Sequence, residues 1–210
     1  MTLGVLLAHG SPDPRSARWV ACAAAGASDR AGFPVVGAFL DHDFPRLDDA
    51  VASAGADDEV VVLPLLLSAA FHARVDVPAA VAALPRPVTL LDPLGHPPEV
   101  LDAALLRAGA SCVVVAAGTK VDDERAAFAD AVAVASARTG VPASAAFATG
   151  PGARLAESAP GTVVVPWLLA PGRLLDSVLA AAAESPYAVA GGPLLDEPTM
   201  LDAIAARLIR

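Results

Sequence analysis

The chain has 210 residues, of which 55% are hydrophobic and only 4% aromatic, and its mean hydropathy is +0.57. This composition excludes an intrinsically disordered chain, because disordered segments are poor in apolar residues and rich in charge. The net charge of -9, from 23 acidic and 14 basic residues, argues against a nucleic-acid-binding protein, which needs a basic surface. The length allows one large domain or two of about 100 residues.

Membrane and redox functions find no support in the sequence. The longest apolar run, residues 60–67, contains Pro64 and is far shorter than the roughly 18 to 20 residues of a membrane span. Residues 1–7 lack the basic flank and cleavage site of a signal peptide. We therefore expect a cytoplasmic protein without membrane contact. Cys22 and Cys112 have no metal-like or redox spacing, and we expect both thiols to be buried.

Short apolar runs alternate with longer alanine-rich segments along the chain, which is typical of repeated strand–helix units. Several of these strands show no polar alternation, as expected for a parallel sheet covered on both faces. The pattern predicts strands at residues 5–8, 35–40, 60–63, 88–91, 113–116, 144–147, 163–165 and 187–190. It predicts helices at residues 15–31, 46–54, 75–84, 99–108, 122–139, 153–158, 174–184 and 200–208.

The chain also contains an internal duplication. Residues 7–11 match residues 115–119, residues 62–67 match 164–169, and the segment from 93 to 103 matches that from 193 to 203. The glycine, proline and aspartate positions agree along with the apolar ones. We therefore predict an α/β protein with two similar halves, residues 1–109 and 110–210. Each half is expected to hold a parallel four-stranded sheet flanked by helices, with the active-site cleft between the halves.

All four histidines fall in the first half, close to the predicted carboxyl ends of its strands, where parallel sheets bind ligands. His9 follows the first strand, His42 the second, His72 the third and His96 the fourth. The second half has Ala117 in place of His9 and contains no histidine. A residue that maintains the fold should occur in both copies, whereas a functional site is needed in one. The asymmetry therefore predicts a site in the first half.

Imidazoles together with a carboxylate suit a borderline divalent metal such as iron, cobalt, nickel, copper or zinc. Asp41, after the second strand, is the candidate carboxylate. The set lacks a thiolate and looks too open for a structural zinc site, which usually has four protein ligands. We expect a site that binds and releases its metal.

Three segments resemble the class II chelatases, the sirohydrochlorin chelatases that insert a divalent metal into a tetrapyrrole. One is His9-Gly10-Ser11 with Pro14-Arg15, and another is Phe39-Leu40-Asp41 with Pro45 and Leu47. The third is residues 62–69 running into His72-Ala73-Arg74-Val75-Asp76-Val77-Pro78. The His-Gly-Ser sequence alone is a weak signal, but its combination with this last segment is specific. The resemblance covers the first half closely and the second more weakly, as in the two-half, single-chain members of the family.

The resemblance implies a lyase of sirohaem or cobalamin biosynthesis, a sirohydrochlorin ferrochelatase or cobaltochelatase. His9 and His72 become the catalytic, metal-binding pair, with Asp41 where relatives usually have glutamate. An imidazole fits because its ordinary pKa of about 6.5 allows it to bind metal when neutral and to accept a proton near neutral pH. The expected substrate-binding residues are Ser11, Arg15, Arg18, Ser68, Phe71 and Arg74. His42 and His96 are further candidates, or else a surface residue and a turn residue.

The expected substrates are the polycarboxylate tetrapyrrole sirohydrochlorin and a divalent metal, with Fe²⁺ slightly favoured over Co²⁺ and with Ni²⁺ as a third choice. No organic cofactor and no ATP are expected, since the sequence has no G-x-x-x-x-G-K-[ST] phosphate loop. We expect a monomer whose halves act as a pseudo-dimer. Two alternatives stay open: a non-catalytic protein that binds or delivers a tetrapyrrole or metal, and a metal-free α/β enzyme using His9 as general base.

Overall fold

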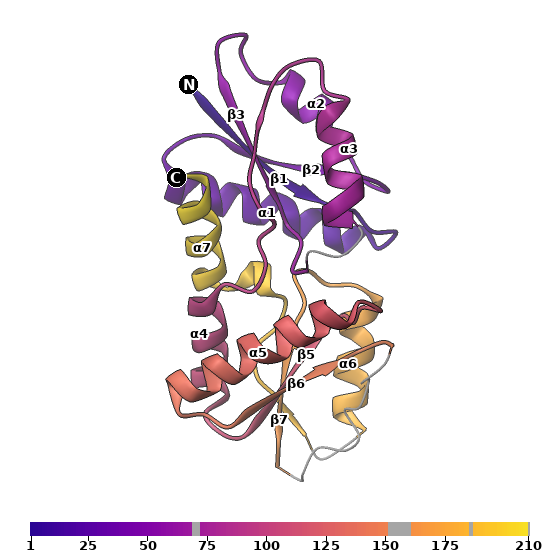
Figure 1. The fold of residues 1–210 in the computed structure, drawn as a ribbon, viewed down its shortest axis with the longest axis vertical. Helices are drawn as coiled ribbons and strands as arrows, with labels where there is room; N and C mark the ends of the chain where they lie inside the picture. The colour runs from indigo at the N-terminus through magenta and orange to yellow at the C-terminus, as the bar shows by residue number, and fades with distance from the viewer. Residues whose placement is uncertain (69–71, 151–160, 185–186, 210) are drawn as a thin grey trace. The chain divides into compact units, whose positions relative to one another are not determined.

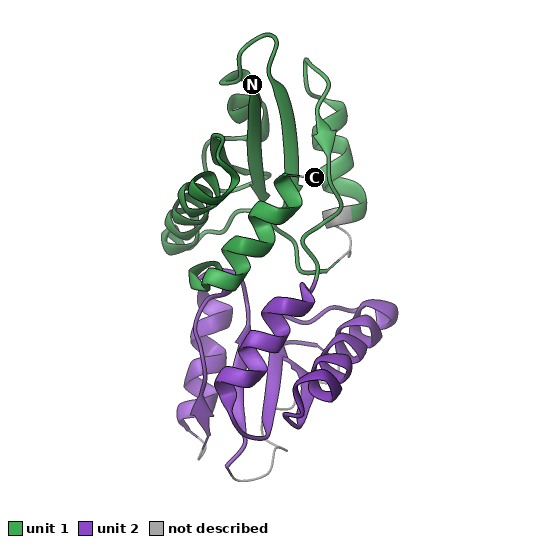
Figure 2. Cartoon of the chain, turned by 90° about the vertical axis from the view of Figure 1, so that its left-hand side faces the viewer, with its two compact units in different colours: residues 1–95, 195–210 green, residues 96–194 purple. Residues whose placement is uncertain are grey.

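The computed structural model describes residues 1–68, 72–150, 161–184 and 187–209, with backbone alone at residues 72 and 73 (Figure 1). Contacts divide the chain into two compact units (Figure 2). Unit 1 consists of residues 1–95 and 195–210, and unit 2 consists of residues 96–194.

Each unit contains one parallel four-stranded sheet. In unit 1 the order is β2-β1-β3-β4, formed by β1 (Thr2–Ala8), β2 (Val35–Phe39), β3 (Glu59–Pro64) and β4 (Thr89–Leu90). In unit 2 the order is β6-β5-β7-β8, formed by β5 (Cys112–Ala116), β6 (Ala143–Phe147), β7 (Val163–Trp167) and β8 (Ala188–Val189). The identical order confirms the prediction of two similar α/β halves, and each predicted strand overlaps an observed one.

The helices follow the predicted alanine-rich segments. They are α1 (Pro14–Ala31), α2 (Leu47–Ala52), α3 (Val77–Ala82), α4 (Pro98–Ala108), α5 (Asp122–Thr139), α6 (Arg173–Ala183) and α7 (Pro198–Leu208). A π-helical turn, η1 (His72–Asp76), leads directly into α3, and a 3-10 turn, η2 (Leu194–Asp196), precedes α7. The helix predicted at residues 153–158 lies outside the described residues.

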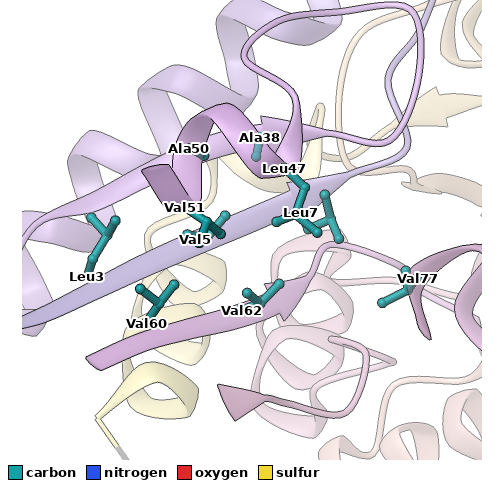
Figure 3. Packing of buried hydrophobic residues seen from close by; sticks show 10 residues of the cluster. All are labelled: Leu3, Val5, Leu7, Ala38, Leu47, Ala50, Val51, Val60, Val62 and Val77. Carbon is teal, nitrogen blue, oxygen red and sulfur yellow. The ribbon is translucent and has the colours of Figure 1, made fainter. Parts of the chain in front are cut away.

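The core of unit 1 packs one face of its sheet against α2 and α3 (Figure 3). Leu3, Val5 and Leu7 alternate along β1 and therefore point to the same face of the sheet. They contact apolar residues of the neighbouring strands and of both helices, namely Ala38, Leu47, Ala50, Val51, Val60, Val62 and Val77. The core fixes β1 and β2 beside each other, so the loops at their carboxyl ends are held in place.

The core of unit 2 repeats this arrangement with α6 in the corresponding position. Val113 and Val115 of β5 pack with Val164 of β7 against Leu175 and other residues of α6. On the other face, Phe128 and Val132 of α5 are fully buried.

The last helix of each sequence half belongs to the unit that the other half mainly forms. Helix α4 contacts α5 and β7, while α7 contacts α1 and β3. Two equivalent ion pairs join these helices: Arg30 to Asp202 at 2.6 Å, and Arg138 to Asp102 at 2.6 Å. The predicted boundary at 109/110 follows the sequence repeat and stays a prediction. The contacts divide the chain near residues 95 and 195 because the two final helices are exchanged.

The expectation that both thiols are buried is wrong for Cys22, which is exposed on α1, and confirmed for Cys112. Desolvation raises the pKa of the Cys112 thiol. Cys22 differs because it lies on the outward side of an alanine-rich helix, a position that composition alone does not identify. Among the helices of the described segments, none is both long and apolar enough to span a bilayer.

Candidate metal-handling site

The loops that follow β1 and β2 lie side by side at the carboxyl end of the unit 1 sheet. The Leu40 amide donates to the Ala8 carbonyl at 3.0 Å, and the Asp41 amide donates to the His9 carbonyl at 2.8 Å. These bonds continue the parallel pairing of β1 and β2 beyond the strands. The predicted residues His9 and Asp41 are therefore held on adjacent strand ends.

The His9 ring is oriented by its own loop. Its Nδ1 lies 3.3 Å from the Gly10 carbonyl oxygen. Because a carbonyl oxygen only accepts, this contact requires the proton of a neutral imidazole to be on Nδ1. The lone pair of Nε2 can then bind a metal ion or accept a proton.

Gly10 allows the two loops to approach closely. Its φ of +95° lies in the left-handed region, and a Cβ atom there would lie only 1.8 Å from the Asp41 carbonyl oxygen. No other residue fits without displacing the loop after β2. The glycine of the His-Gly-Ser segment is thus required by the contact between the two loops.

Asp43 ties the same two loops together. Its Oδ2 accepts the Ser11 amide at 3.0 Å, and the Ser11 hydroxyl accepts the Asp13 amide at 3.1 Å. Asp13 caps the start of α1 by accepting the Arg15 amide. A chain of hydrogen bonds therefore links the β2 loop, the His9 loop and the first turn of α1.

The Asp41 side chain is 59% exposed and lies close to two basic groups. Its Oδ1 accepts the His42 amide at 2.8 Å and lies 3.5 Å from the Arg46 guanidinium, while its Oδ2 lies 3.7 Å from Nε2 of His42. The backbone hydrogen bond from His42, followed by the charges of His42 and Arg46, lowers the pKa of this carboxyl below its ordinary 3.8. Asp41 is therefore a carboxylate at neutral pH.

His42 adopts a left-handed backbone conformation, which is uncommon for a residue other than glycine. Its φ is +63°, the one positive φ of a non-glycine residue among those the structure describes. In this conformation its ring centroid lies 6.2 Å from that of His9. The structure thus brings together His9, Asp41 and His42.

The remaining predicted site residues differ in exposure and in how much of each the structure describes. Phe71 lies outside the described residues, and of His72 the structure gives only the backbone, at the start of η1. Ser68 is partly buried beyond the end of β3, and Arg74 is exposed within η1. Arg18 is exposed on α1. The guanidinium of Arg15 is paired with the Asp13 carboxylate, with its Nη2 at 2.6 Å from Oδ2.

His96 belongs to unit 2 and packs against aromatic side chains. Its Nδ1 accepts the indole N–H of Trp167 at 2.9 Å, and its ring lies 4.8 Å from that of Phe128. Burial, against a smaller opposing effect of the Glu124 charge, lowers the pKa of His96 from 6.5 to about 4. It is therefore a neutral imidazole whose Nδ1 is already engaged.

Unit 2 keeps the backbone of the site without its chemical groups. Gly118 has a φ of +108°, and a Cβ atom there would lie 2.2 Å from the Thr149 carbonyl oxygen. The Thr149 amide donates to the Ala117 carbonyl at 3.1 Å, as Asp41 does to His9. The turn geometry therefore belongs to the duplicated fold, whereas the imidazole and the carboxylate occur at these positions in unit 1 alone.

A groove of about 630 Å³ runs along α1 and the edge strand β2. Its described lining is mostly small and apolar and contains no histidine; the residues are Ala17, Ala21, Ala24, Ala25, Ser28, Asp29, Val35, Val36, Gly37, Phe39, Phe44 and Pro45. The histidines that the sequence singled out follow the strand ends, so this groove is not the candidate site.

Two residues at the site escaped prediction. Asp43 positions the His9 loop, and Arg46 donates from Nη1 to the Leu40 carbonyl at 2.7 Å while facing Asp41. Both lie in the same loop as Asp41, and that shared position was the available signal. Arg46 was assigned only to the start of a helix, because a sequence does not show a side chain that folds back on its loop.

The described groups can bind a cation and accept protons. Imidazole and carboxylate together suit borderline divalent metals. Within the described residues, no three side chains of His, Cys, Asp or Glu already surround a point where a metal ion could bind.

Comparison with known proteins points to one family. The family model described as CbiX matches residues 3–110, just over half of the chain. No curated protein is similar enough in sequence to count as a relative.

Three solved structures share the fold. SirB from Bacillus subtilis with Fe³⁺ has a TM-score of 0.75 and 22% identity, and the match covers 99% of this chain and 94% of SirB. DR2241 from Deinococcus radiodurans, a multi-domain protein with structural similarity to chelatases, has a TM-score of 0.77 and 22% identity, over 100% of this chain and 55% of that one. CbiX, the terminal enzyme for biosynthesis of siroheme in denitrifying bacteria, has a TM-score of 0.70 and 21% identity, over 99% and 98% of the two chains.

Proposed function

Because the chain belongs to the CbiX family, we propose that it is a sirohydrochlorin chelatase, which inserts a divalent metal into the tetrapyrrole. The observation that carries the proposal is the placement of His9 and Asp41 on adjacent strand ends of unit 1, joined by a backbone hydrogen bond. Unit 2 has the same backbone hydrogen bond between Ala117 and Thr149. The names of SirB with Fe³⁺ and of CbiX in siroheme biosynthesis support the same reaction.

Insertion exchanges one metal ion for the two protons on the pyrrole nitrogens, so the site must release a cation and remove protons. His9 fits both tasks, because the proton on Nδ1 leaves Nε2 as the acceptor. Asp41 balances the positive charge as an ionised carboxylate. His72, the first residue of the π-helical turn η1, is proposed as the second metal ligand and base because its segment resembles that of the class II chelatases. No step requires ATP or an organic cofactor.

The ring carboxylates require cationic partners in an acidic protein. Arg18 is exposed on α1 and Arg74 is exposed on η1, and we propose both for this role, together with Ser11, Ser68 and Phe71. Arg15 is the weakest of the proposed set, because its guanidinium is paired with Asp13. We favour Fe²⁺ over Co²⁺ as the metal, and hence sirohaem over cobalamin as the product, in a cytoplasmic monomer.

Absorbance spectroscopy tests the proposal. Purified protein mixed under anaerobic conditions with sirohydrochlorin and Fe²⁺, Co²⁺ or Ni²⁺ should convert the spectrum of the free ring to that of the metallated ring faster than the uncatalysed mixture does. Equal rates with and without protein for all three metals would overturn the proposal.

A binding or delivery protein of the same fold is the second candidate. It is favoured by Asp41, a shorter carboxylate than the usual glutamate, which also lies 3.5 Å from Arg46. This candidate predicts stoichiometric binding of sirohydrochlorin, together with a metal-insertion rate that does not change in the His9→Ala and His72→Ala variants.

A further inference from the structure

We propose that His42 and Asp41 form a metal-receiving pair that takes the divalent ion from solvent and presents it to His9. This inference rests on the proposed function, because it assigns the entry point of the metal substrate at the same site.

The distance between the two side chains fits shared ligation. Nε2 of His42 lies 3.7 Å from Oδ2 of Asp41. Two ligand atoms on one tetrahedral ion lie about 3.4 Å apart when each metal–ligand bond is about 2.1 Å. The pair therefore needs only a small movement to hold an ion between these two atoms.

The two carboxylate oxygens of Asp41 have different contacts, and Oδ2 is the one that faces the His42 imidazole. The His42 amide and the Arg46 guanidinium both approach Oδ1. The Arg46 contact, at 3.5 Å, is longer than the usual range for a charged hydrogen bond. An ion at Oδ2 would thus leave the contacts of Oδ1 in place.

The left-handed backbone of His42 needs an explanation beyond the contact of its side chain with Asp41. A non-glycine residue in this region costs free energy, and such residues concentrate at functional sites. The side chains of His42 and Asp41 are 41% and 59% exposed, and an exposed ion pair contributes too little to offset that cost. Metal ligation gives this conformation a function.

The proposed receiving pair is also more exposed to solvent than His9. His42 and Asp41 are exposed, whereas His9 is partly buried. The centroids of the His9 and His42 rings are 6.2 Å apart. Two imidazoles on one ion place their centroids about 5 to 6.5 Å apart, given metal–nitrogen bonds of about 2 Å. An ion received by His42 is therefore already within reach of His9.

Titration with Co²⁺ in the absence of tetrapyrrole tests the inference, with the visible absorption of the bound ion as readout. The variants His42→Asn and His42→Gly both tolerate a left-handed backbone, so they remove the imidazole without straining the loop. Each should weaken Co²⁺ binding at least about tenfold, and free imidazole should restore binding to His42→Gly. The matched control, His96→Asn in unit 2, should bind as the wild type does.

The two proposals fail in different ways. Wild-type affinity for Co²⁺ in both His42 variants, or no Co²⁺ binding by the wild-type protein, would overturn the metal-receiving pair even if metal insertion is observed. Loss of Co²⁺ binding in the variants, in a protein that does not accelerate insertion, would support the pair and contradict the chelatase proposal.

Discussion

Asp41 is the residue at which this chain departs from the pattern that its resemblance to class II chelatases implies. Because its pKa lies below the ordinary 3.8, Asp41 is ionised between pH 5 and 8, and its protonation does not limit activity in that range. Substitution with Asn removes the charge at constant shape, and we expect the insertion rate to fall by about 10². Substitution with Glu keeps the charge and should stay within about tenfold of wild type. Rates at saturating metal, measured by absorbance, check both values; equal rates for Asp41→Asn and wild type would contradict the role of the carboxylate.

His96 gives unit 2 a pH-dependent stability. Its pKa is 6.5 in a free side chain and about 4 in the fold, so between these values the unfolded chain binds more protons than the folded one. The contribution is fully present above pH 6.5 and is lost as the pH falls towards 4, by an amount on the order of 2 to 3 kcal/mol. The free energy of unfolding, measured from pH 7 to 4, should fall more steeply in wild type than in His96→Asn, which keeps an acceptor for Trp167 but does not titrate. Parallel curves would contradict this account.

At the scale of elements, the contact between the β1 and β2 loops is the feature that the site depends on. Gly10→Ala adds a Cβ at 1.8 Å from the Asp41 carbonyl oxygen, whereas Gly32 also has a positive φ, of +77°, but a Cβ added there meets no atom within 4 Å. Both substitutions strain the backbone by about 1 kcal/mol or more, and Gly10→Ala must displace the loop as well.

We therefore expect Gly10→Ala to lower both stability and insertion rate, and Gly32→Ala to lower stability alone. Gly118→Ala, whose Cβ would lie 2.2 Å from the Thr149 carbonyl oxygen, serves as the matched control in unit 2. It should destabilise the protein and leave the rate of the folded fraction unchanged. Thermal unfolding and absorbance assays on the same samples separate the two effects; a Gly10→Ala variant with the wild-type rate would count against the importance of the loop contact.

The sequence was sufficient to predict strands and helices because their signals are local. Apolar runs such as residues 60–63 and the periodicity of 15–31 each lie within one element. The helix predicted at 75–84 begins instead as η1, since a π-helical turn leaves no distinct residue pattern. The candidate site was predictable in His9 and Asp41, which directly follow strands. The role of Arg46 was not predictable, because that role depends on its side chain folding back to the Leu40 carbonyl.

At the scale of the whole molecule, the exchange of α4 and α7 could not be inferred from the duplicated sequence. The repeat places α4 with the first half, yet its partners are α5 and β7 of unit 2. Each helix could pack on its own sequence half or on the other half. Both arrangements bury the same apolar face and satisfy the same periodicity, so the choice depends on long-range packing. Stability of unit 1 should therefore depend on a helix at the far end of the chain.

Two matched core substitutions test that dependence. Ile204 in α7 and Leu105 in α4 are both fully buried, and truncation of either to Ala should cost about 2 to 5 kcal/mol. Amide hydrogen exchange should rise first in β1 and β3 for Ile204→Ala, and in β5 and β7 for Leu105→Ala. The reverse assignment would show that the helices belong to the halves in which they occur in sequence.

The central claim is that metal insertion depends on the imidazole present in one copy of a duplicated fold. The most direct test is the initial rate of metal insertion into sirohydrochlorin by wild type and by His9→Ala, compared at equal folded concentration. We predict that the wild type accelerates insertion and that His9→Ala loses at least about 100-fold of that rate, while His96→Asn retains it. A His9→Ala variant that inserts metal at the wild-type rate would contradict the account.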